Sequence, residues 1–231
     1  MFDRSADIYD AIYSFKDYAA EVAAVDGLIQ KRKPGAKTLL DVACGTGAHL
    51  EHLAASYEVE GLDIEGALLE VARRRMPDVV LHRGDMTDFD LEKTFDVITC
   101  LFSAIGYVQT EKGLGRAIAA MVRHLEPGGV LIVEPWLGPD VFEDGRIDMT
   151  LVDEPGLKIA RTNNSSIEDG ISVLEFHYLV TRPEGTTHFS ETHRLGLFTT
   201  EQHLRAFEAA GLDADYDPEG LMGRGLYVAV R

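Results

Sequence analysis

Short apolar runs alternate with helix-like stretches over residues 17–134. The run at 38–44 is almost entirely hydrophobic, which is typical of a strand buried on both faces of a sheet. Four similar runs predict further strands, at 59–64, 79–82, 95–102 and 130–134. Helices are predicted before and between them, at 17–31, 48–56, 66–75 and 111–124. This regular alternation predicts an α/β fold on an open, parallel sheet with right-handed crossovers.

The second half of the chain changes to β-rich sequence. Turn signals such as Asp169-Gly170 separate four further apolar runs, at 149–152, 159–165, 171–181 and 187–198. We expect these runs to form an antiparallel meander added to the parallel sheet, as an insertion of about residues 146–198. A predicted helix at 199–210, which ends at Gly211, and a last strand at 226–230 return to the α/β core.

The length of 231 residues fits one domain over 1–231, with an N-terminal helical cap at 1–34. The chain has 22 Lys and Arg against 39 Asp and Glu, which gives a formal charge of −17. A field of that sign repels phosphate backbones and anionic membrane surfaces, so we expect no nucleic-acid or membrane partner. An anionic small substrate would need a local group of cations.

The cysteines and the N-terminal residues indicate the cellular compartment of the protein. Cys44 and Cys100 lie in apolar runs and are too few for a disulfide framework, so buried, reduced thiols are expected. The first residues lack the basic and apolar regions of a signal peptide. No apolar run approaches the ~20 residues that a membrane span needs. The sequence therefore predicts a cytoplasmic protein.

The motif with the most chemical content is the turn 41–47, which reads DVACGTG. It follows a predicted buried strand and opens a predicted helix, which is the context of a nucleotide-binding turn. Its glycines allow a tight turn and close approach of the backbone to a ligand. Asp63 ends the next strand, where a carboxylate can bind both ribose hydroxyls. These features predict a cofactor that contains adenosine.

Two cofactors compete for this geometry. NAD needs a third glycine three residues after Gly47, and Leu50 stands there instead. S-adenosylmethionine carries no phosphate and needs no such glycine. Asp41 can hold its ammonium group, and Asp85 after the third strand can accept from the exocyclic amine of adenine. The alternative for both acids is that they only cap the turns that follow them.

The predicted cofactor site combines these acids and glycines with their neighbours at the strand ends. Its members are Asp41, Ala43, Gly45, Gly47, Asp63, Ile64, Asp85, Met86 and Leu101.

Four segments resemble the class I S-adenosylmethionine-dependent methyltransferases: 41–47, 61–63, 84–86 and 125–129. A narrower resemblance, to the TDP-3-amino-sugar N,N-dimethyltransferases of the desosamine and mycaminose pathways, runs along nearly the whole chain. It is carried by Tyr9-Asp10 with Tyr13, 16–21, 102–107, 134–136 and 223–226. The resemblance implies a Rossmann-like, mostly parallel seven-stranded sheet with helices on both faces, and a β insertion. It also implies a cytosolic homodimer that methylates the amine of a nucleotide-linked deoxysugar twice, with S-adenosylhomocysteine as by-product.

The chain departs from this family at three places. Ser14-Phe15 replaces a Gly-rich, basic stretch, Leu137 stands where the family has a second tryptophan, and Leu221-Met222 replaces glycines. The basic and Gly-rich residues that this chain lacks are candidates for diphosphate or sugar contacts in the family. The departures therefore concern the acceptor and leave the cofactor motifs intact.

Candidate acceptor residues lie near the carboxyl edge of the predicted sheet. A phenol can align an amine and take up its proton, so Tyr13 and Tyr107 are the catalytic candidates. The substrate-binding candidates are Lys16, Glu134, Trp136, His193 and Arg224. Packing in the core is the alternative for the aromatic residues, and a surface salt bridge is the alternative for Arg224.

No metal is expected, because His188 and His193 are five residues apart on one predicted strand and so face opposite sides. The sequence thus predicts a methyltransferase that N-methylates, and N,N-dimethylates, an amino deoxysugar linked to TDP. Methylation of nitrogen or oxygen on another small metabolite is the alternative within this class. A nicotinamide oxidoreductase is disfavoured by Leu50, and a cofactor-sensing module by the large insertion.

Overall fold

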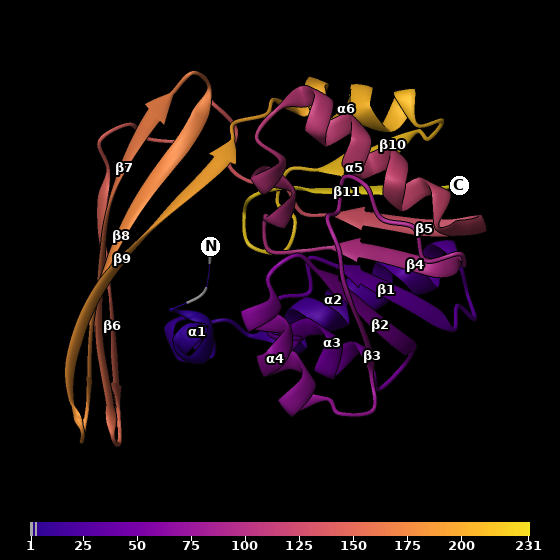
Figure 1. The fold of residues 1–231 in the computed structure, drawn as a ribbon. Coiled ribbons are helices and arrows are strands. Elements are labelled where there is room, and N and C mark those ends of the chain that lie inside the picture. The colour runs from indigo at the N-terminus through magenta and orange to yellow at the C-terminus, as the bar shows by residue number, and fades with distance from the viewer. Residues whose placement is uncertain (1, 3) are drawn as a thin grey trace.

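A seven-stranded sheet forms the core of the computed structural model, which describes residues 2 and 4–231 (Figure 1). Its strand order is β10-β11-β5-β4-β1-β2-β3. Strands β1 to β5 run parallel, and β11 pairs antiparallel with both β5 and β10. The bounds are β1 Thr38–Val42, β2 Glu58–Asp63, β3 Val80–Arg83, β4 Phe95–Cys100, β5 Leu125–Val133, β10 Ala214–Asp217 and β11 Leu226–Val230. This confirms the mostly parallel sheet of seven strands.

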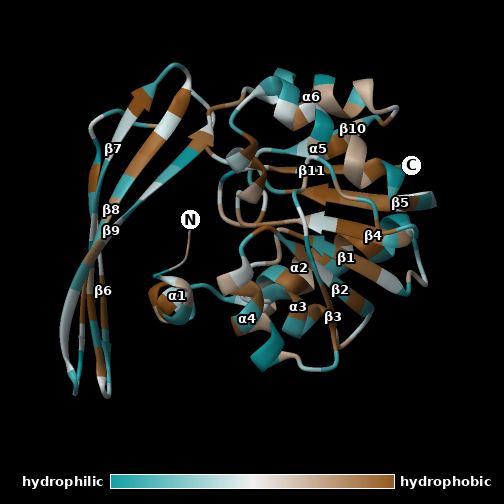
Figure 2. Ribbon diagram, viewed as in Figure 1, coloured by the Kyte–Doolittle hydropathy of each residue, from teal (hydrophilic) through white to brown (hydrophobic). Residues whose placement is uncertain are grey.

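Helices cover both faces of this sheet. Successive residues of one strand, such as Leu39 and Leu40, belong to two separate apolar clusters, because strand side chains alternate between faces. One cluster is completed by α5 and α6, and the other by α2, α3 and α4. Figure 2 shows hydrophobic colouring along the strands between these layers. The helices are α1 Tyr9–Ile12, α2 Tyr18–Arg32, α3 Ala48–Leu53, α4 Gly66–Arg75, α5 Glu111–Arg123 and α6 Thr200–Ala209, with short 3₁₀ segments η1 Ala6–Ile8 and η2 Ala104–Val108.

Side-chain caps fix where several helices begin. The Asp17 carboxylate accepts from the backbone N–H of Ala20 at 2.9 Å, so α2 starts at the predicted place. Thr199 and Gln202 form a capping box that starts α6. The helix predictions are confirmed to within a few residues at each end.

The inserted strands form a sheet of their own. It is an antiparallel meander in the order β6-β7-β8-β9, with bounds Ile147–Glu154, Leu157–Glu168, Ile171–Arg182 and Gly185–Gly196. The predicted antiparallel insertion is confirmed, and it is a separate sheet, since no strand of one sheet pairs with a strand of the other among the described residues. In Figure 1 the two sheets stand apart, with α1 between them.

The N-terminal segment fills the space between the two sheets. Ile8 and Ile12 pack against the inner face of the four-stranded sheet, in a cluster with Tyr178 and Phe189. On its other side, Asp10 forms an ion pair with Arg75 of α4 at 2.5 Å. This segment therefore joins the insertion to the core.

Three strand predictions needed correction. The strands predicted to end at residues 44 and 102 are shorter than predicted. They end earlier because Ala43 and Phe102 adopt positive φ angles of 59° and 53°, which turn the chain. β5 begins at Leu125, before the predicted turn, and the segment 125–129 bulges where its register to β4 shifts. The edge strand β10 was missed, because its sequence ADYD lacks an apolar run.

Within the described residues, no helix is both long and apolar enough to cross a bilayer.

Candidate active site

The glycine turn after β1 opens a space at the carboxyl edge of the large sheet. Gly45 and Gly47 have φ angles of 57° and 77°, a region that disfavours other residues. A Cβ placed on Gly45 would meet no atom within 4 Å, so the backbone there is open to a ligand. A Cβ on Gly61 of β2, by contrast, would lie 2.7 Å from the side chain of Leu50. The close helix–strand contact thus relies on a glycine of the strand, which explains why Leu50 is accommodated on α3.

Asp63 is fixed by the backbone around this turn. Its carboxylate accepts from the N–H of Gly45 at 2.8 Å and from the N–H of Glu65 at 2.7 Å. Burial raises its pKa, although these hydrogen bonds act in the opposite direction. The neighbouring Ile64 is 54% exposed, so an apolar side chain is available beside the carboxylate.

Asp41 lies deeper in the same edge. It is buried and accepts from the hydroxyl of Thr99 on β4 at 2.7 Å. Burial raises the pKa of Asp41 to about 6. A cationic partner at this position would therefore be strongly favoured.

The third acid lies outside the buried part of the edge. Asp85 is exposed and accepts from the N–H of Thr87 at 2.8 Å, which is the turn-capping contact of the alternative interpretation. Met86 is partly buried against the core, and Leu101 is fully buried at the end of β4. The structure thus brings Asp41, Asp63 and the glycines together at the strand ends.

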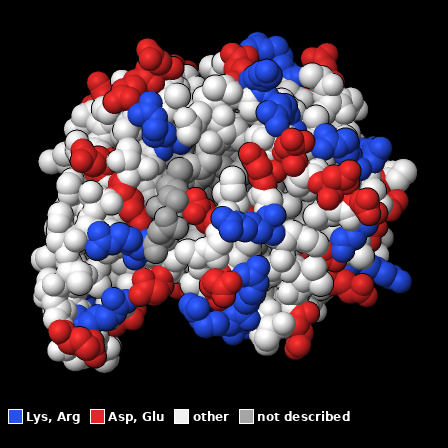
Figure 3. All heavy atoms as spheres, viewed as in Figure 1, with Lys and Arg blue, Asp and Glu red and all other residues white. Residues whose placement is uncertain are grey.

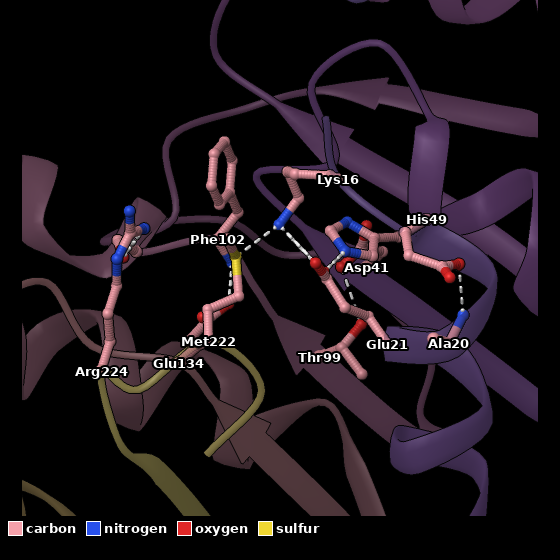
Figure 4. A network of polar contacts seen from close by, with 12 residues as sticks. Lys16, Ala20, Glu21, Asp41, His49, Thr99, Phe102, Glu134, Met222 and Arg224 are labelled. Atoms are coloured by element: carbon pink, nitrogen blue, oxygen red, sulfur yellow. Dashed lines mark hydrogen bonds and ion pairs between the residues drawn. The ribbon is translucent and has the colours of Figure 1, made fainter. Parts of the chain in front are cut away.

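A buried ion network lies over this edge (Figure 4). The Lys16 ammonium contacts Glu21 at 2.8 Å, and Glu21 also contacts His49 of α3 at 2.8 Å. Lys16 lies 3.9 Å above the ring of Phe102 and donates to the sulfur of Met222. The Lys16 side chain has no exposed area, so its charge is already paired inside the protein.

Glu134 lies at the end of β5 and is fully buried. One of its oxygens accepts from the N–H of Phe102 at 2.6 Å. The other oxygen has no hydrogen-bond partner among the residues that the structure describes. Burial raises the pKa of Glu134, while the Arg224 and Lys16 charges act against this rise. An orphaned buried acceptor of this kind fits a ligand that donates a hydrogen bond.

Two arginines contact aromatic residues where the core, the N-terminal segment and the insertion meet. Arg224 donates to the Ser103 hydroxyl at 3.0 Å and lies over the rings of Phe102 and Trp136. Arg161 of β7 donates to the Tyr13 hydroxyl at 3.0 Å. Neither arginine has a carboxylate within 4 Å among residues 2 and 4–231, so the salt-bridge alternative for Arg224 is not supported. Arg161 was not predicted as a site residue, because it lies in no sequence motif.

The remaining acceptor candidates connect the core to the insertion. The Tyr107 hydroxyl and His193 Nδ1 are 2.7 Å apart. The indole N–H of Trp136 donates to the Ser172 hydroxyl on β8 at 2.9 Å. Tyr13 packs edge-on against Phe102, with ring centroids 5.1 Å apart. His188 is exposed while His193 is buried, as the prediction of opposite faces requires.

Comparison with known proteins decides between the candidate chemistries. Residues 39–129 match a family model described as a methyltransferase domain. A dTDP-3-amino-3,4,6-trideoxy-alpha-D-glucopyranose N,N-dimethyltransferase from Streptomyces venezuelae is 44% identical and covers 97% of each chain. A dTDP-4-amino-2,3,4,6-tetradeoxy-D-glucose N,N-dimethyltransferase from Saccharopolyspora spinosa is 45% identical over 98% of this chain and 92% of the relative.

The chain belongs to the amino-sugar N,N-dimethyltransferase family of class I S-adenosylmethionine-dependent methyltransferases.

A solved member of this family is CalS10, an amino pentose methyltransferase of Micromonospora echinaspora with S-adenosylmethionine bound. It has a TM-score of 0.89 and 44% identity to this chain, and the match covers 97% of this chain and 96% of that one. The family predicted from the sequence is thereby confirmed. The open glycine turn, the buried Asp41 and the backbone-held Asp63 fit the family's sulfonium cofactor. No group of metal-ligating side chains converges within the described part of the chain.

Proposed function

We propose that this protein transfers two methyl groups in turn to the amine of a TDP-linked amino deoxysugar. The observation that carries the nucleotide-linked substrate is the pair Arg161 and Arg224, two guanidinium groups with no carboxylate within 4 Å among the described residues, in a chain of charge −17. They are linked through Tyr13 and Phe102, whose rings pack against each other. Arginine binds phosphate oxygens bidentately, so the pair suits a diphosphate.

The surface charge supports a local rather than a general anion site. On the face shown in Figure 3, basic and acidic side chains are interspersed. Lys16, one of the substrate-binding candidates from the sequence, is neutralised by Glu21. We therefore assign diphosphate binding to Arg161 and Arg224. Lys16 instead holds the N-terminal segment over the carboxyl edge of the large sheet.

The residues around the acceptor perform positioning and proton handling. When bound, S-adenosylmethionine supplies the electrophilic methyl group. Tyr13 and Tyr107 present hydroxyl groups that align the amine. Trp136 closes the wall between the core and the insertion, which excludes water, and the free oxygen of Glu134 accepts a hydrogen bond from a ligand. Asp41, Asp63, Asp85 and the glycines of the turn keep the cofactor-binding roles that the sequence predicted for them.

Dependence on the nucleotide tests this proposal. We expect kcat/KM for a dTDP-linked 3-amino-3,6-dideoxyhexose to exceed that for the same sugar without nucleotide by ~10²-fold or more, since two charge-assisted contacts are lost. Equal values for the two substrates would contradict the diphosphate assignment. The two relatives act on 3-amino and 4-amino sugars, so both regioisomers belong in the comparison.

A homodimer is the second part of the proposal. Ile147, Met149 and Leu151 alternate along the edge strand β6, are 78%, 63% and 65% exposed, and so face one side. An uncovered apolar edge strand invites aggregation, and a second copy of the chain is the occupant that covers it by symmetry. Sedimentation equilibrium should show a dimer that Leu151→Lys converts to monomer, whereas Ser56→Lys on the exposed surface of the core leaves it intact. A monomeric wild type would refute this assembly.

We also infer one methyltransferase domain over 1–231, in which the cap and the insertion do not fold apart. The packing of Ile8 and Ile12 on the four-stranded sheet and the Asp10–Arg75 ion pair support this view. The buried thiols of Cys44 and Cys100 support a reducing, cytoplasmic location.

A further inference from the structure

A row of phenol, imidazole and carboxylate groups runs from Tyr107 through the buried His193 to Glu191, which contacts the N-terminal segment. The Tyr107 hydroxyl lies 2.7 Å from His193 Nδ1, and His193 Nε2 lies 3.7 Å from a carboxylate oxygen of Glu191. His193 is 3% exposed, and its ring is packed between those of Phe2 and Phe176. Nε2 has no hydrogen-bond partner within the described residues, so its nearest acceptor is the carboxylate.

Glu191 is held in place as an ionised group. The Ser5 hydroxyl donates to it at 2.7 Å, and the backbone N–H groups of Arg4 and Ser5 donate at 3.3 and 3.2 Å. Burial would raise the pKa of Glu191, but the contacts with His193, Ser5 and Arg4 lower it below its usual value. The carboxylate is therefore negative when it faces the imidazole.

The phenol at the other end of the row stays neutral. Burial, reinforced by Tyr13 and Tyr178, raises the pKa of Tyr107 well above its usual value, so the phenol stays protonated. Asp63 and Glu191 act on it in the same sense. The group in line with the Tyr107 hydroxyl that can take a proton is the imidazole of His193, whose far nitrogen faces the Glu191 carboxylate.

We propose that His193 and Glu191 form a proton-accepting pair that acts on the acceptor amine through Tyr107. This inference rests on the proposed function, and it gives His193 a position behind Tyr107 rather than in direct contact with the sugar. Glu191, which the sequence analysis did not single out, is the positioning residue that stabilises the imidazolium.

The proton balance is simple. Methyl transfer leaves an ammonium group on the sugar, and the N–H bond of that group breaks while its electron pair stays on nitrogen. The proton passes to the Tyr107 oxygen as the phenolic proton passes to Nδ1 of His193. The phenol is unchanged, and the imidazole carries the charge until the path reverses after product release. Nδ1 must start without a proton, so the neutral ring carries its proton on Nε2, toward Glu191.

This path matters most for the second methyl group. The first amine can enter from solution in its neutral form, whereas the monomethyl ammonium is formed inside the closed site and must lose a proton there. Loss of the proton-accepting pair should therefore slow the second methyl transfer more than the first.

His193→Asn tests the path, since the amide can still accept from Tyr107 but cannot take a proton. We expect kcat to fall by ~10- to 100-fold, with KM nearly unchanged and monomethyl product accumulating. His188→Asn, the same change on the outer face of β9, should behave like wild type. Wild-type kcat and product ratio in His193→Asn would overturn the proposal.

Glu191→Gln supplies a readout that does not depend on the substrate. In the protein alone, imidazole NMR should show the Nε2–H tautomer of His193, and the Nε2–H signal should shift in Glu191→Gln, because the carboxylate that faces it becomes an amide. A proton on Nδ1, or an Nε2–H signal that does not move, would overturn the pair even if the amino sugar is methylated. If the wild-type protein methylates no amino sugar but these NMR results are still observed, the proposed function is wrong and the proton-accepting pair stands. Glu191→Asp should restore part of the shift.

Discussion

The cofactor half and the acceptor half of the site are built in different ways. The cofactor half uses the ends of neighbouring parallel strands, and its carboxylates are held by backbone N–H groups, as Asp63 is by Gly45. The acceptor half joins segments far apart in the chain, as in the contact between Tyr13 and Arg161. It relies on aromatic rings and side-chain hydrogen bonds. The first half is a property of the sheet, and the second exists only when the N-terminal segment and the insertion close on the core.

This difference predicts that substitutions will separate cofactor binding from acceptor binding. The largest effect is expected for Asp63→Ala, which removes a carboxylate that is held by the backbone of the turn and is predicted to bind the ribose. Two hydrogen bonds to a charged group are worth about 3–6 kcal/mol, so affinity for S-adenosylhomocysteine should fall by ~10³-fold in calorimetry. Unchanged affinity would remove Asp63 from the cofactor half.

Asp41→Asn should raise stability while it weakens cofactor binding. Burial raises the pKa of Asp41 from 3.8 to about 6, so the ionised carboxylate opposes folding. Below about pH 4 Asp41 is protonated in both the folded and the unfolded chain, so it does not oppose folding. As the pH rises through 6 the buried carboxyl must ionise, and above that range the free energy of unfolding is lower by about 3 kcal/mol. Asparagine keeps the acceptor for Thr99 and carries no charge.

The pH dependence of melting checks this prediction. The variant should melt ~5–10 °C above the wild type at pH 8 and nearly level with it at pH 4. An advantage that is the same at both values would show that titration of Asp41 is not its cause.

Smaller effects are expected in the acceptor half. Arg161→Met and Arg224→Met should each raise KM for the nucleotide sugar by ~10- to 50-fold, as one charge-assisted contact is lost. Affinity for S-adenosylhomocysteine should stay at the wild-type value, which separates the two halves. Arg205→Met, at an exposed ion pair on α6, is the matched control. Equal losses for cofactor and sugar would mean that the halves are not independent.

The two halves also differ in how far the sequence predicts them. The glycine turn and Asp63 are local signals, because a buried strand, a turn and a helix follow one another within a few residues. Arg161 carries no such signal, since a single arginine in a polar strand acquires meaning only when Tyr13 lies against it. The Glu191–His193 spacing of two places both on one face of a strand, and this pattern was available but unused. Lys16 was predicted to bind the substrate, and its buried ion pair with Glu21 was not foreseen.

The strand that was missed illustrates the same limit. β10 has acidic residues at alternate positions and pairs only with β11 at the edge of the sheet. Its existence depends on the neighbouring strand rather than on its own apolar content. The meander, by contrast, was recognised from its turns, but its separation from the large sheet depends on the packing of Ile8 and Ile12.

The number of methyl groups added to the sugar tests the central claim most directly. The protein should be incubated with S-adenosylmethionine and a dTDP-linked 3-amino-3,6-dideoxyhexose, with the 4-amino isomer in parallel, and the products weighed by mass spectrometry. The account predicts a gain of two methyl groups on one of these sugars, located on its nitrogen. No gain on either sugar, while S-adenosylhomocysteine still stabilises the fold, would contradict the amino-sugar assignment.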